Sequence, residues 1–405
     1  MTFAIALSGL NAASADLEVT ANNIANVSTT GFKESRAEFA EVFATGTQSV
    51  SSNASGSGVR LSRIAQQFSQ GNIDFTDNAL DLAIGGEGFF VLSDNGGRLY
   101  SRAGAFSVDA DGFVVNAQGN NLQAYPSAGN GLFNTGTPDD LRLTTGASPP
   151  RATTTANMGL NLPAAAAVPI VAVFDATDPN SFNHTASATV YDTLGSAHTA
   201  TFYFIKDAAL NIWNVRAQID GTDVGGATPI TFGSDGLLLL PAGGQLVLPS
   251  YTPTTGAADI DVTLNFTNTT QFGNAFGVNS LSQDGFTTGR LTGLSVDAEG
   301  VVAARFTNGQ SVQLGKLAVA NFANPQGLQQ LGNTAWGESS GSGDALLGEA
   351  NTASFGSIQS GALEASNVDL TAQLVKMITS QRNFQANAQA IETSDAVTQT
   401  VINIR

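Results

Sequence analysis

The fold is decided by the carboxyl-terminal stretch Leu363–Arg405, which reads LEASNVDLTAQLVKMITSQRNFQANAQAIETSDAVTQTVINIR. Apolar residues recur in it at alternating intervals of three and four, a spacing that aligns them on one face of a helix. Gln381, Asp395 and Thr398 interrupt this stripe, so it predicts an imperfect coiled-coil-like seam that packs without being sealed. The seam residues are Leu370, Leu374, Met377, Phe384, Ala388, Ile391 and Ile402.

The amino terminus carries a second apolar stripe with the same spacing, in which Ser14 is the one polar member. Fixing the backbone costs about 1–2 kcal/mol per residue, whereas burying a large side chain returns roughly 1.5–3 kcal/mol only once something covers it. Neither helix is therefore expected to be stable alone, and the two stripes invite pairing. The seam residues at this end are Phe3, Leu7, Leu10, Leu17, Ala21 and Ile24.

Polar side chains and one glycine set the expected limits of the two helices. Ser366, three residues before Asp369, offers a side-chain acceptor followed by an acid in the first turn of the carboxyl-terminal helix. The amino-terminal helix is expected to end within Asn22–Lys33. In that stretch Asn, Ser and Thr compete for backbone hydrogen bonds, and Gly31 permits a positive φ.

An irregular arm and a linker are expected after the first helix. Phe32 and Phe39 supply apolar anchors for the arm. Residues 45–58 are rich in Ser, Gly, Thr and Asn, a composition that is typical of a flexible or extended connection.

From about residue 70 the pattern changes to the period of two that is typical of β-strands. Asp94-Asn95-Gly96-Gly97, between two apolar runs, predicts a hairpin because Asn-Gly tolerates the positive φ of a tight turn. Ser107–Val115 and Ser295–Ala303 share the pattern Ser-Val-Asp-Ala-acid-Gly. We expect both to be hairpin turns that belong to one β domain.

Between these two copies, an inserted β domain with its own core is expected. Apolar and polar residues alternate over 213–219 and 262–266, as in strands with one buried face. Pro149-Pro150 marks the start of the insertion and the polar stretch Asn268–Gln271 its exit.

The predicted fold is mainly β with α-helical termini and discontinuous nested domains. Residues 1–70 and 360–405 form a terminal helical domain with an extended arm, 71–149 and 284–359 a discontinuous β domain, and 150–283 the inserted β domain.

Composition excludes several classes of function. Acidic residues outnumber basic residues by 33 to 16, for a net charge of −17, which argues against nucleic acid and anionic membrane as partners. The chain has no cysteine, so disulfides and thiolate metal sites are excluded. The first basic residue is Lys33, so a cleaved signal peptide is not expected. The longest apolar run, Ala164–Phe174, is too short to insert across a membrane.

Short motifs that imitate catalytic or binding sites lack the context that such sites need. Gly337–Gly341 fits a nucleophile elbow but has no apolar strand before it and no histidine downstream. His184 and His198 lack the tight spacing of metal ligands, and Asp109–Gly112 and Gly85–Gly88 lack the spacing of calcium and phosphate loops. We predict no catalytic residue, no cofactor and no metal. A secreted, β-rich glycan-active enzyme stays open as an alternative, because paired carboxylates meet only on folding.

Both ends of the chain resemble the signatures of the rod and hook family of bacterial flagellar axial proteins. Ser8-Gly9-Leu10 leads into the amino-terminal signature, and Gly361–Leu370 opens the carboxyl-terminal one. The motif residues are Asn22, Asn23, Ile24, Ala25, Asn26, Gly31, Phe32 and Lys33 at the first end and Asn367, Val368, Asp369, Leu370, Gln381, Arg382 and Asn383 at the second.

Within this family the flanking β segments are similar to those of hook proteins. The similar segments are Leu80–Ile84, Gly88–Phe90, Tyr100–Arg102 and Ala320–Phe322. The resemblance implies a chain folded out and back, with terminal helices innermost and the inserted domain outermost. It implies self-assembly through a polymerisation seam into a hollow, curved, flexible tube, a universal joint that transmits torque from the rod to the filament.

The same resemblance implies partners and a location. The implied partners are further copies of the chain, the distal rod protein, the hook cap protein, the hook-filament junction protein and the flagellar type III export apparatus. The implied location is extracellular, at the hook of the flagellum. A rod protein and a junction protein remain alternatives, although rod relatives are shorter and lack a large insertion, and junction proteins are expected to have longer helical regions.

Overall fold

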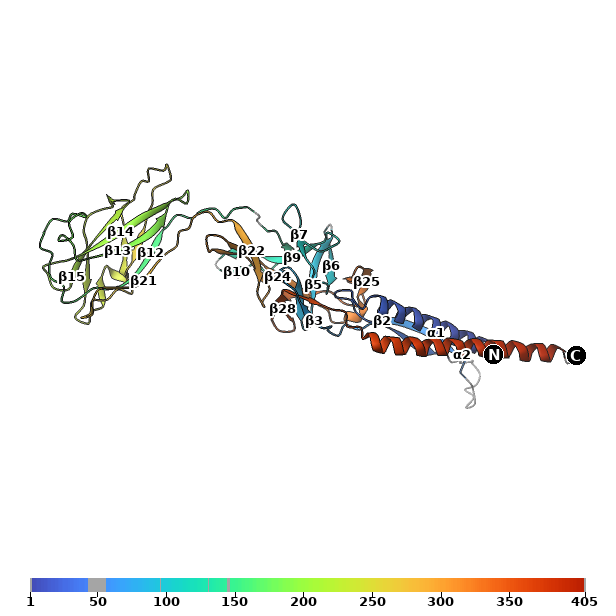
Figure 1. Ribbon diagram of the computed structural model, residues 1–405. Coiled ribbons are helices and arrows are strands. Elements are labelled where there is room, and N and C mark those ends of the chain that lie inside the picture. Colours follow the sequence, from blue (N-terminus) through green and yellow to red (C-terminus); the bar gives the residue numbers. More distant parts are fainter. Residues whose placement is uncertain (1, 43–55, 95, 130, 144–145, 404–405) are drawn as a thin grey trace. The chain divides into compact units, whose positions relative to one another are not determined.

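The computed structural model divides the chain into two compact units, each with its own core (Figure 1). The terminal unit holds Met1–Thr145, Gly293–Arg305 and Ser311–Arg405. The inserted unit holds Gly146–Thr292 and Phe306–Gln310. The residues that the structure describes are 2–42, 56–94, 96–129, 131–143 and 146–403.

The terminal unit begins with α1 (Thr2–Ala25) and ends with α2 (Leu370–Asn403). α1 stops inside the predicted stretch. The Asn26 side chain donates a hydrogen bond to the carbonyl oxygen of Asn22, and Gly31, at φ +69°, turns the chain away. None of the described helices combines the length and the apolar character needed to cross a membrane.

The N-cap of α2 differs from the one that we predicted. Asp369 Oδ1 accepts hydrogen bonds from the N–H groups of Thr371, at 2.8 Å, and Ala372, at 3.2 Å. Ser366 Oγ instead accepts from the N–H of Val368, outside the helix. The prediction that Ser366 caps the first turn is therefore wrong, because the carboxylate next to the free amide groups satisfies two of them.

The segment after α1 is a β-ribbon, and the prediction of an irregular arm is wrong. β1 (Ser35–Glu41) and β2 (Val59–Gln66) pair antiparallel with a bulge before Phe39, so each strand satisfies backbone groups of the other. α1 contacts both strands. Phe32 is buried, whereas Phe39 is exposed. Residues 45–55 of the predicted linker, 45–58, lie outside the described residues.

A 13-stranded sheet forms the β part of the terminal unit, with a main path β22-β23-β24-β9-β5-β6-β26-β25. β24 pairs with β9, β5 and β27, so strands from the two halves of the chain interleave. The strands are β5 (Phe89–Asp94), β6 (Gly97–Ser101), β7 (Ser107–Val108), β8 (Val114–Val115), β9 (Asn121–Gly129), β10 (Leu132–Phe133), β11 (Asp139–Asp140), β22 (Leu291–Val296), β23 (Val301–Phe306), β24 (Ser311–Asn321), β25 (Gln329–Gly332), β26 (Ala335–Gly337) and β27 (Leu346–Glu349).

The central strands of this sheet are buried on both faces. Phe90 and Leu92 of β5 belong to one apolar cluster, whereas Phe89 and Val91 belong to another. This is why the sequence there is a continuous apolar run and not an alternating one. The short 3₁₀ turn η2 (Pro325–Gly327) precedes β25.

Two short antiparallel ladders join the early and late parts of the chain. β3 (Ile73–Phe75) pairs with β29 (Ala362–Glu364), and β4 (Leu82–Gly85) pairs with β28 (Ser357–Ser360). Both ladders bring the segment that leads to α2 back beside the segment that follows β2.

The two copies of the repeated motif are hairpin turns with the same hydrogen bonds, as predicted. Asp109 Oδ1 accepts from the N–H groups two and four residues on, at 3.0 and 2.7 Å. Asp297 Oδ1 accepts from the corresponding groups at 3.0 and 2.8 Å. Gly112 and Gly300 take the positive φ that each turn requires. The hairpin of β5 and β6 is confirmed as well.

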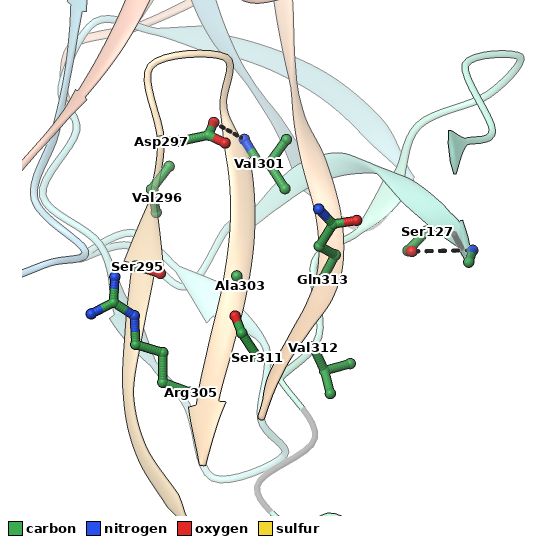
Figure 2. A pocket seen from close by; sticks show the side chains of 11 residues that line it. Ser127, Ser295, Val296, Asp297, Val301, Ala303, Arg305, Ser311, Val312 and Gln313 are labelled. Atoms are coloured by element: carbon green, nitrogen blue, oxygen red, sulfur yellow. Dashed lines mark hydrogen bonds between the residues drawn. The ribbon is translucent and has the colours of Figure 1, made fainter. Parts of the chain in front are cut away.

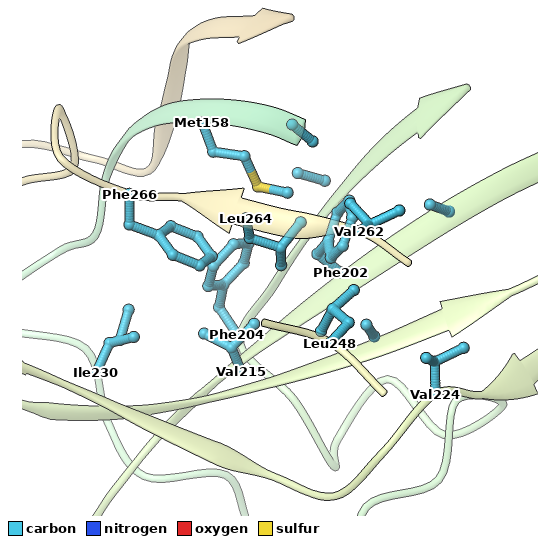
Figure 3. Packing of buried hydrophobic residues seen from close by; sticks show 14 of the residues in the cluster. Met158, Phe202, Phe204, Val215, Val224, Ile230, Leu248, Val262, Leu264 and Phe266 are labelled. Carbon is cyan, nitrogen blue, oxygen red and sulfur yellow. The ribbon is translucent and has the colours of Figure 1, made fainter. Parts of the chain in front are cut away.

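The inserted unit consists of two sheets around one core (Figure 3). Phe202 and Phe204 of one sheet pack with Met158, Leu264 and Phe266 of the other. One sheet follows β13-β14-β15-β17-β18 with β16 beside β15, and the other follows β19-β20-β12-β21. The elements are β12 (Thr155–Asn161), β13 (His184–Tyr191), β14 (Ala197–Lys206), β15 (Ile212–Ile219), β16 (Thr222–Asp223), β17 (Thr228–Phe232), β18 (Leu238–Leu240), η1 (Ala242–Gly244), β19 (Gln245–Val247), β20 (Thr263–Asn265) and β21 (Gly277–Gln283).

The predicted fold class, mainly β with helical termini and one β domain inserted in another, is confirmed. Residues of β15 alternate between half-buried and buried positions, as its sequence pattern indicated. The predicted insertion, 150–283, lies within the inserted unit, which extends further at both ends. The finer three-part division at residues 70, 149, 283 and 359 stays a prediction.

Candidate functional site

The two terminal signatures meet at one place in the terminal unit, which we name the terminal joint (residues 22–35 and 362–373). The N–H of Gly31 donates to the carbonyl oxygen of Glu364 at 2.8 Å, and the N–H of Glu34 donates to Asn367 Oδ1 at 2.7 Å. From this joint α1 and α2 run side by side (Figure 1). The joint therefore fixes how the two helices leave the β part of the unit.

A buried ion cluster lies at the centre of the terminal joint. Glu364 Oε1 lies 2.6 Å from Nζ of Lys33, and Glu364 Oε2 lies 3.2 Å from Nη1 of Arg102. The Lys33 and Glu364 side chains are fully buried. Lys33 also donates to the carbonyl oxygen of Ser69 at 2.9 Å, and the N–H of Gly71 donates to Glu364 Oε1 at 2.9 Å. Burial lowers the pKa of the Lys33 ammonium, an effect that the charge of Glu364 opposes.

Arg102 connects this ion cluster to the main sheet. It follows β6 in the sequence, and its Nη2 donates to the carbonyl oxygen of Gly86 at 2.8 Å. The guanidinium lies 5.3 Å from the centre of the Phe89 ring, within range of a cation–π contact. One carboxylate, Glu364, thus ties together the segment after α1, the segment before α2 and the sheet.

Side-chain amides complete the joint. Asn23 Oδ1 accepts from the N–H of Ser35 at 2.9 Å while its Nδ2 donates to the carbonyl oxygen of Ser35 at 2.8 Å. Gln373 of α2 accepts from Asn23 at 3.3 Å and donates to Glu34 Oε1 at 2.8 Å. Asn367 Nδ2 donates to the carbonyl oxygen of Gln67 at 2.8 Å. The amides act as strand partners for backbone that would otherwise be unpaired.

Gly31 is required at its position for two separate reasons. Its φ of +69° lies in the region that favours glycine, and a Cβ there would lie 2.4 Å from the backbone nitrogen of Ala103. The signature loop can therefore approach the chain after β6 only without a side chain at this position.

The structure brings together about half of the predicted motif residues. Those at the joint are Asn23, Gly31, Phe32, Lys33, Asn367, Val368 and Asp369. Asn22, Ala25 and Leu370 are exposed at its edge, and Ile24 and Asn26 are half-buried. Gln381, Arg382 and Asn383 are exposed along α2 and lie outside the joint. Their motif role stays a prediction.

Sequence reasoning missed Glu34, Glu364 and Gln373 of the joint as site residues, and also Arg102 beside it. A signal for Glu364 was available, since it is the single charged residue between Gly361 and Ser366. A lone charge among small and apolar residues indicates a buried, paired group. Nothing in the sequence indicated that Arg102 was its second partner.

α1 and α2 contact each other through small and polar side chains. Ser380 Oγ donates to Asp16 Oδ2 at 2.5 Å, and Lys376 Nζ lies 3.3 Å from Asp16 Oδ1. Gly9 allows a close approach, since a Cβ there would lie 2.5 Å from the side-chain oxygen of Asn387. The helices therefore pair, as the sequence suggested, and small and polar side chains take part in the contact.

The apolar stripes are only partly covered. Exposed members are Phe3, Leu7, Ala21, Leu370, Leu374 and Phe384, and half-buried members are Leu10, Leu17, Ile24, Met377, Ala388 and Ile391. The side chain of Ile402 lies outside the described residues. Among the seam residues whose side chains are described, none is buried. Their role as a polymerisation seam stays a prediction.

A groove of about 580 Å³ lies over β22, β23 and β24 (Figure 2). Small or polar side chains such as Ser295, Ala303 and Ser311 line it, and Asp297 is its one carboxylate. The described residues contain no group of three His, Asp or Glu side chains placed to hold a metal ion. The groove thus offers no carboxylate pair of the kind that glycoside hydrolysis uses.

Comparison with known proteins first identifies the class of protein to which the chain belongs. Residues 3–33 match the family described as flagella basal body rod protein, and residues 359–404 match the carboxyl-terminal family of flagellar basal body rod FlgEFG proteins. These two matches cover both sides of the terminal joint. They define a structural component of the axial part of the bacterial flagellum.

Family matches in the β regions, together with full-length relatives, identify the protein family within this class. Residues 83–167 match the D1 domain of flagellar hook protein FlgE/F/G, and residues 161–286 match the D2 domain of flagellar basal body protein FlaE. The chain is 38% identical to flagellar hook protein FlgE of Escherichia coli K12 over 413 residues, with 100% of both chains covered. It is 31% identical to that of Borreliella burgdorferi, with 98% of both covered. The chain belongs to the flagellar hook protein FlgE family.

Solved structures agree at the level of the fold. The crystal structure of Helicobacter pylori flagellar hook protein FlgE2 superposes with a TM-score of 0.53 at 14% identity, covering 72% of this chain and 100% of that chain. The prediction of a hook protein is confirmed, ahead of a rod protein, a junction protein and a glycan-active enzyme. The chain is a structural subunit of the flagellar hook and not an enzyme.

Proposed function

We propose that this chain assembles with copies of itself into a hollow, curved, flexible tube that transmits torque from the rod to the filament. The observation that supports this most is that members of both apolar stripes, on α1 and on α2, stay exposed. Leu370 and Leu374 are 43% and 45% exposed although the two helices already contact each other. Neighbouring subunits would bury these side chains, and the terminal helices would gain stability on assembly.

The terminal joint gives the tube a stiff inner part in this proposal. Glu364 pairs with Lys33 and Arg102, and Asn23 with Gln373, in buried positions, so displacing one helix would leave polar groups unpaired. Torque on the helices would then be passed to the main sheet through Glu364 and Arg102.

The inserted unit carries the adjustable contacts in this proposal. Its edge strand β13 and neighbouring β14 present exposed hydroxyl side chains at Thr185, Ser187, Thr189 and Thr199. Hydroxyl groups offer many similar hydrogen-bond registers and few deep apolar contacts, which suits surfaces that slide as a tube bends.

The further partners proposed are the distal rod protein, the hook cap protein and the hook-filament junction protein. Export in an unfolded state through the flagellar type III apparatus, without a cleaved signal peptide, would deliver the chain to the outside of the cell. The absence of cysteine and the dependence of the helices on partners are compatible with passage as an unfolded chain.

Polymerisation of the purified protein tests the seam. Leu374→Ser should lower tube formation at least tenfold, as measured by sedimentation and electron microscopy, while leaving the thermal unfolding temperature of the monomer nearly unchanged. Val375→Ser is the matched control, since Val375 is 61% exposed on the same helix but lies off the seam. Equal effects of the two substitutions would count against the seam.

A truncation provides a second, independent test of the same proposal. Protein that lacks residues 1–30 should remain β-rich and soluble but should fail to form tubes. Tubes of normal appearance from this truncation would refute the proposed role of α1.

A further inference from the structure

The inserted unit holds a histidine between two carboxylates, a group that we name the histidine clasp (Asp192, His198 and Asp220). His198, on β14, is 6% exposed. Its Nδ1 lies 2.6 Å from Asp220 Oδ2, and its Nε2 lies 3.3 Å from Asp192 Oδ2. A carboxylate only accepts hydrogen bonds, so both ring nitrogens are satisfied only when both carry a proton. The geometry therefore favours the charged imidazolium.

Both carboxylates are held in place by other groups. Asp192 Oδ2 accepts from Thr255 Oγ1 at 2.8 Å, and its Oδ1 accepts from the N–H groups two and four residues on. Asp220 Oδ1 accepts from the N–H of Thr199 at 2.9 Å. The Tyr251 ring lies 6.0 Å from that of His198, and burial, followed by the nearby charge of Asp220, raises the pKa of the Tyr251 phenol. The titratable groups that face the imidazole are thus Asp192, Asp220 and Tyr251.

The electrostatics agree with this geometry. Burial alone would lower the pKa of His198, but its hydrogen bonds and charge contacts with Asp220 and Asp192 raise that pKa above its ordinary value. Burial would raise the pKa of Asp192, yet hydrogen bonds from the Ser196 N–H, Thr255 and His198 lower it to about 2.

The clasp anchors a turn that packs against both segments by which the chain enters and leaves the inserted unit. Asp192 begins this turn, and Gly195 within it has φ +82°. A Cβ at Gly195 would lie 2.8 Å from Cβ of Pro150, on the incoming segment, and 3.4 Å from Cα of Thr287, on the outgoing segment. The clasp, the turn and the two segments are therefore one packed group.

We propose that the histidine clasp is a pH-sensitive switch that holds the incoming and outgoing segments firmly while His198 is charged and loosens them as the pH rises. The stabilisation is complete below the pKa of an unfolded histidine, about 6.5, and is lost as the pH rises through the higher pKa of the folded state. On the acid side, Asp192 loses its contribution as the pH falls through about 2. The switch acts within the inserted unit and does not depend on the proposed assembly.

The full-length protein tests this proposal in two ways. First, nuclear magnetic resonance should show the His198 imidazole titrating above the value of a free histidine. Second, amide hydrogen-exchange protection of residues 192–196 and 286–289 should fall between pH 6 and pH 9, by up to tenfold for each unit by which the His198 pKa is raised.

His198→Gln should abolish this pH dependence of protection. His184→Gln is the matched control: His184 stacks on Phe276 with ring centres 4.4 Å apart, and burial lowers its pKa, so its loss should leave the dependence intact. An imidazole that titrates at or below the free value, or an unchanged pH dependence in His198→Gln, would overturn the proposal. If His198→Gln does not fold, the titration of the unmodified protein decides alone.

Discussion

At the scale of single residues, Glu364 links three segments of the terminal unit, although it was not among the motif residues predicted from the sequence. Its two oxygens serve two cations that come from distant parts of the chain. A buried carboxylate of this kind adds little net stability over an apolar replacement of the whole cluster. Removing the Glu364 carboxylate alone destabilises the protein strongly, because the two cations that remain are then buried without a counter-charge.

We therefore expect Glu364→Gln to destabilise the protein by about 3–5 kcal/mol, measured by urea unfolding. Glu38→Gln is the control, since Glu38 also accepts from two arginines, at 2.9 and 2.7 Å, but on the exposed β-ribbon. That substitution should change stability little, because solvent screens surface ion pairs. Similar losses for the two substitutions would mean that burial does not decide the effect.

At the scale of elements, α2 shows how one side chain sets the start of a long helix. Most of α2 is exposed in the isolated chain, so its first turn depends on Asp369 and on the contacts of Gln373. The cap fixes the position along the chain where the helix begins, and the spacing of the seam then determines which side chains face outward.

Asp369→Ala should lower the stability of α2 by about 1 kcal/mol, seen as earlier loss of helical circular dichroism on heating. Ser366→Ala should have a smaller effect, because Ser366 accepts a hydrogen bond outside the helix. A larger loss of helix stability for Ser366→Ala than for Asp369→Ala would support Ser366 as the N-cap, as the sequence predicted.

At the scale of the whole molecule, the inserted unit is a separate folded body whose two ends lie close together. The N–H of Ser148 donates to the carbonyl oxygen of Gly289 at 2.7 Å, and the N–H of Arg151 donates to that of Phe286 at 3.0 Å. A short linker can therefore close the gap that removing residues 150–283 would leave. The core of the inserted unit and the cores of the terminal unit involve different residues.

Replacing residues 150–283 with a short Gly-Ser linker should leave a chain that still forms tubes, because the seam and the terminal joint are unchanged. The curvature of those tubes, measured by electron microscopy, should differ from that of tubes of the full chain. Unchanged curvature would contradict the proposal that the inserted unit carries the adjustable contacts.

Periodicity and turn chemistry alone indicated the two helices and several of the strands. The three-and-four spacing indicated both helices, the shared Ser-Val-Asp-Ala-acid-Gly pattern indicated the two equivalent hairpins, and the alternation over 213–219 indicated β15. These signals are local, because backbone geometry and side-chain period act over a few residues. The terminal signatures also resembled the correct family, since they were present in the sequence itself.

Only the tertiary structure decided which groups meet. Lys33, Arg102 and Glu364 are separated by up to 331 residues, and no local pattern links them. The ribbon of β1 and β2 was missed because pairing across the intervening segment, and not strand periodicity, stabilises it. The sequence likewise contained both apolar stripes, but only packing showed that small and polar side chains take part in the α1–α2 contact and that members of both stripes stay exposed. Burial and long-range pairing depend on the whole chain, whereas helix and strand periods depend on neighbours.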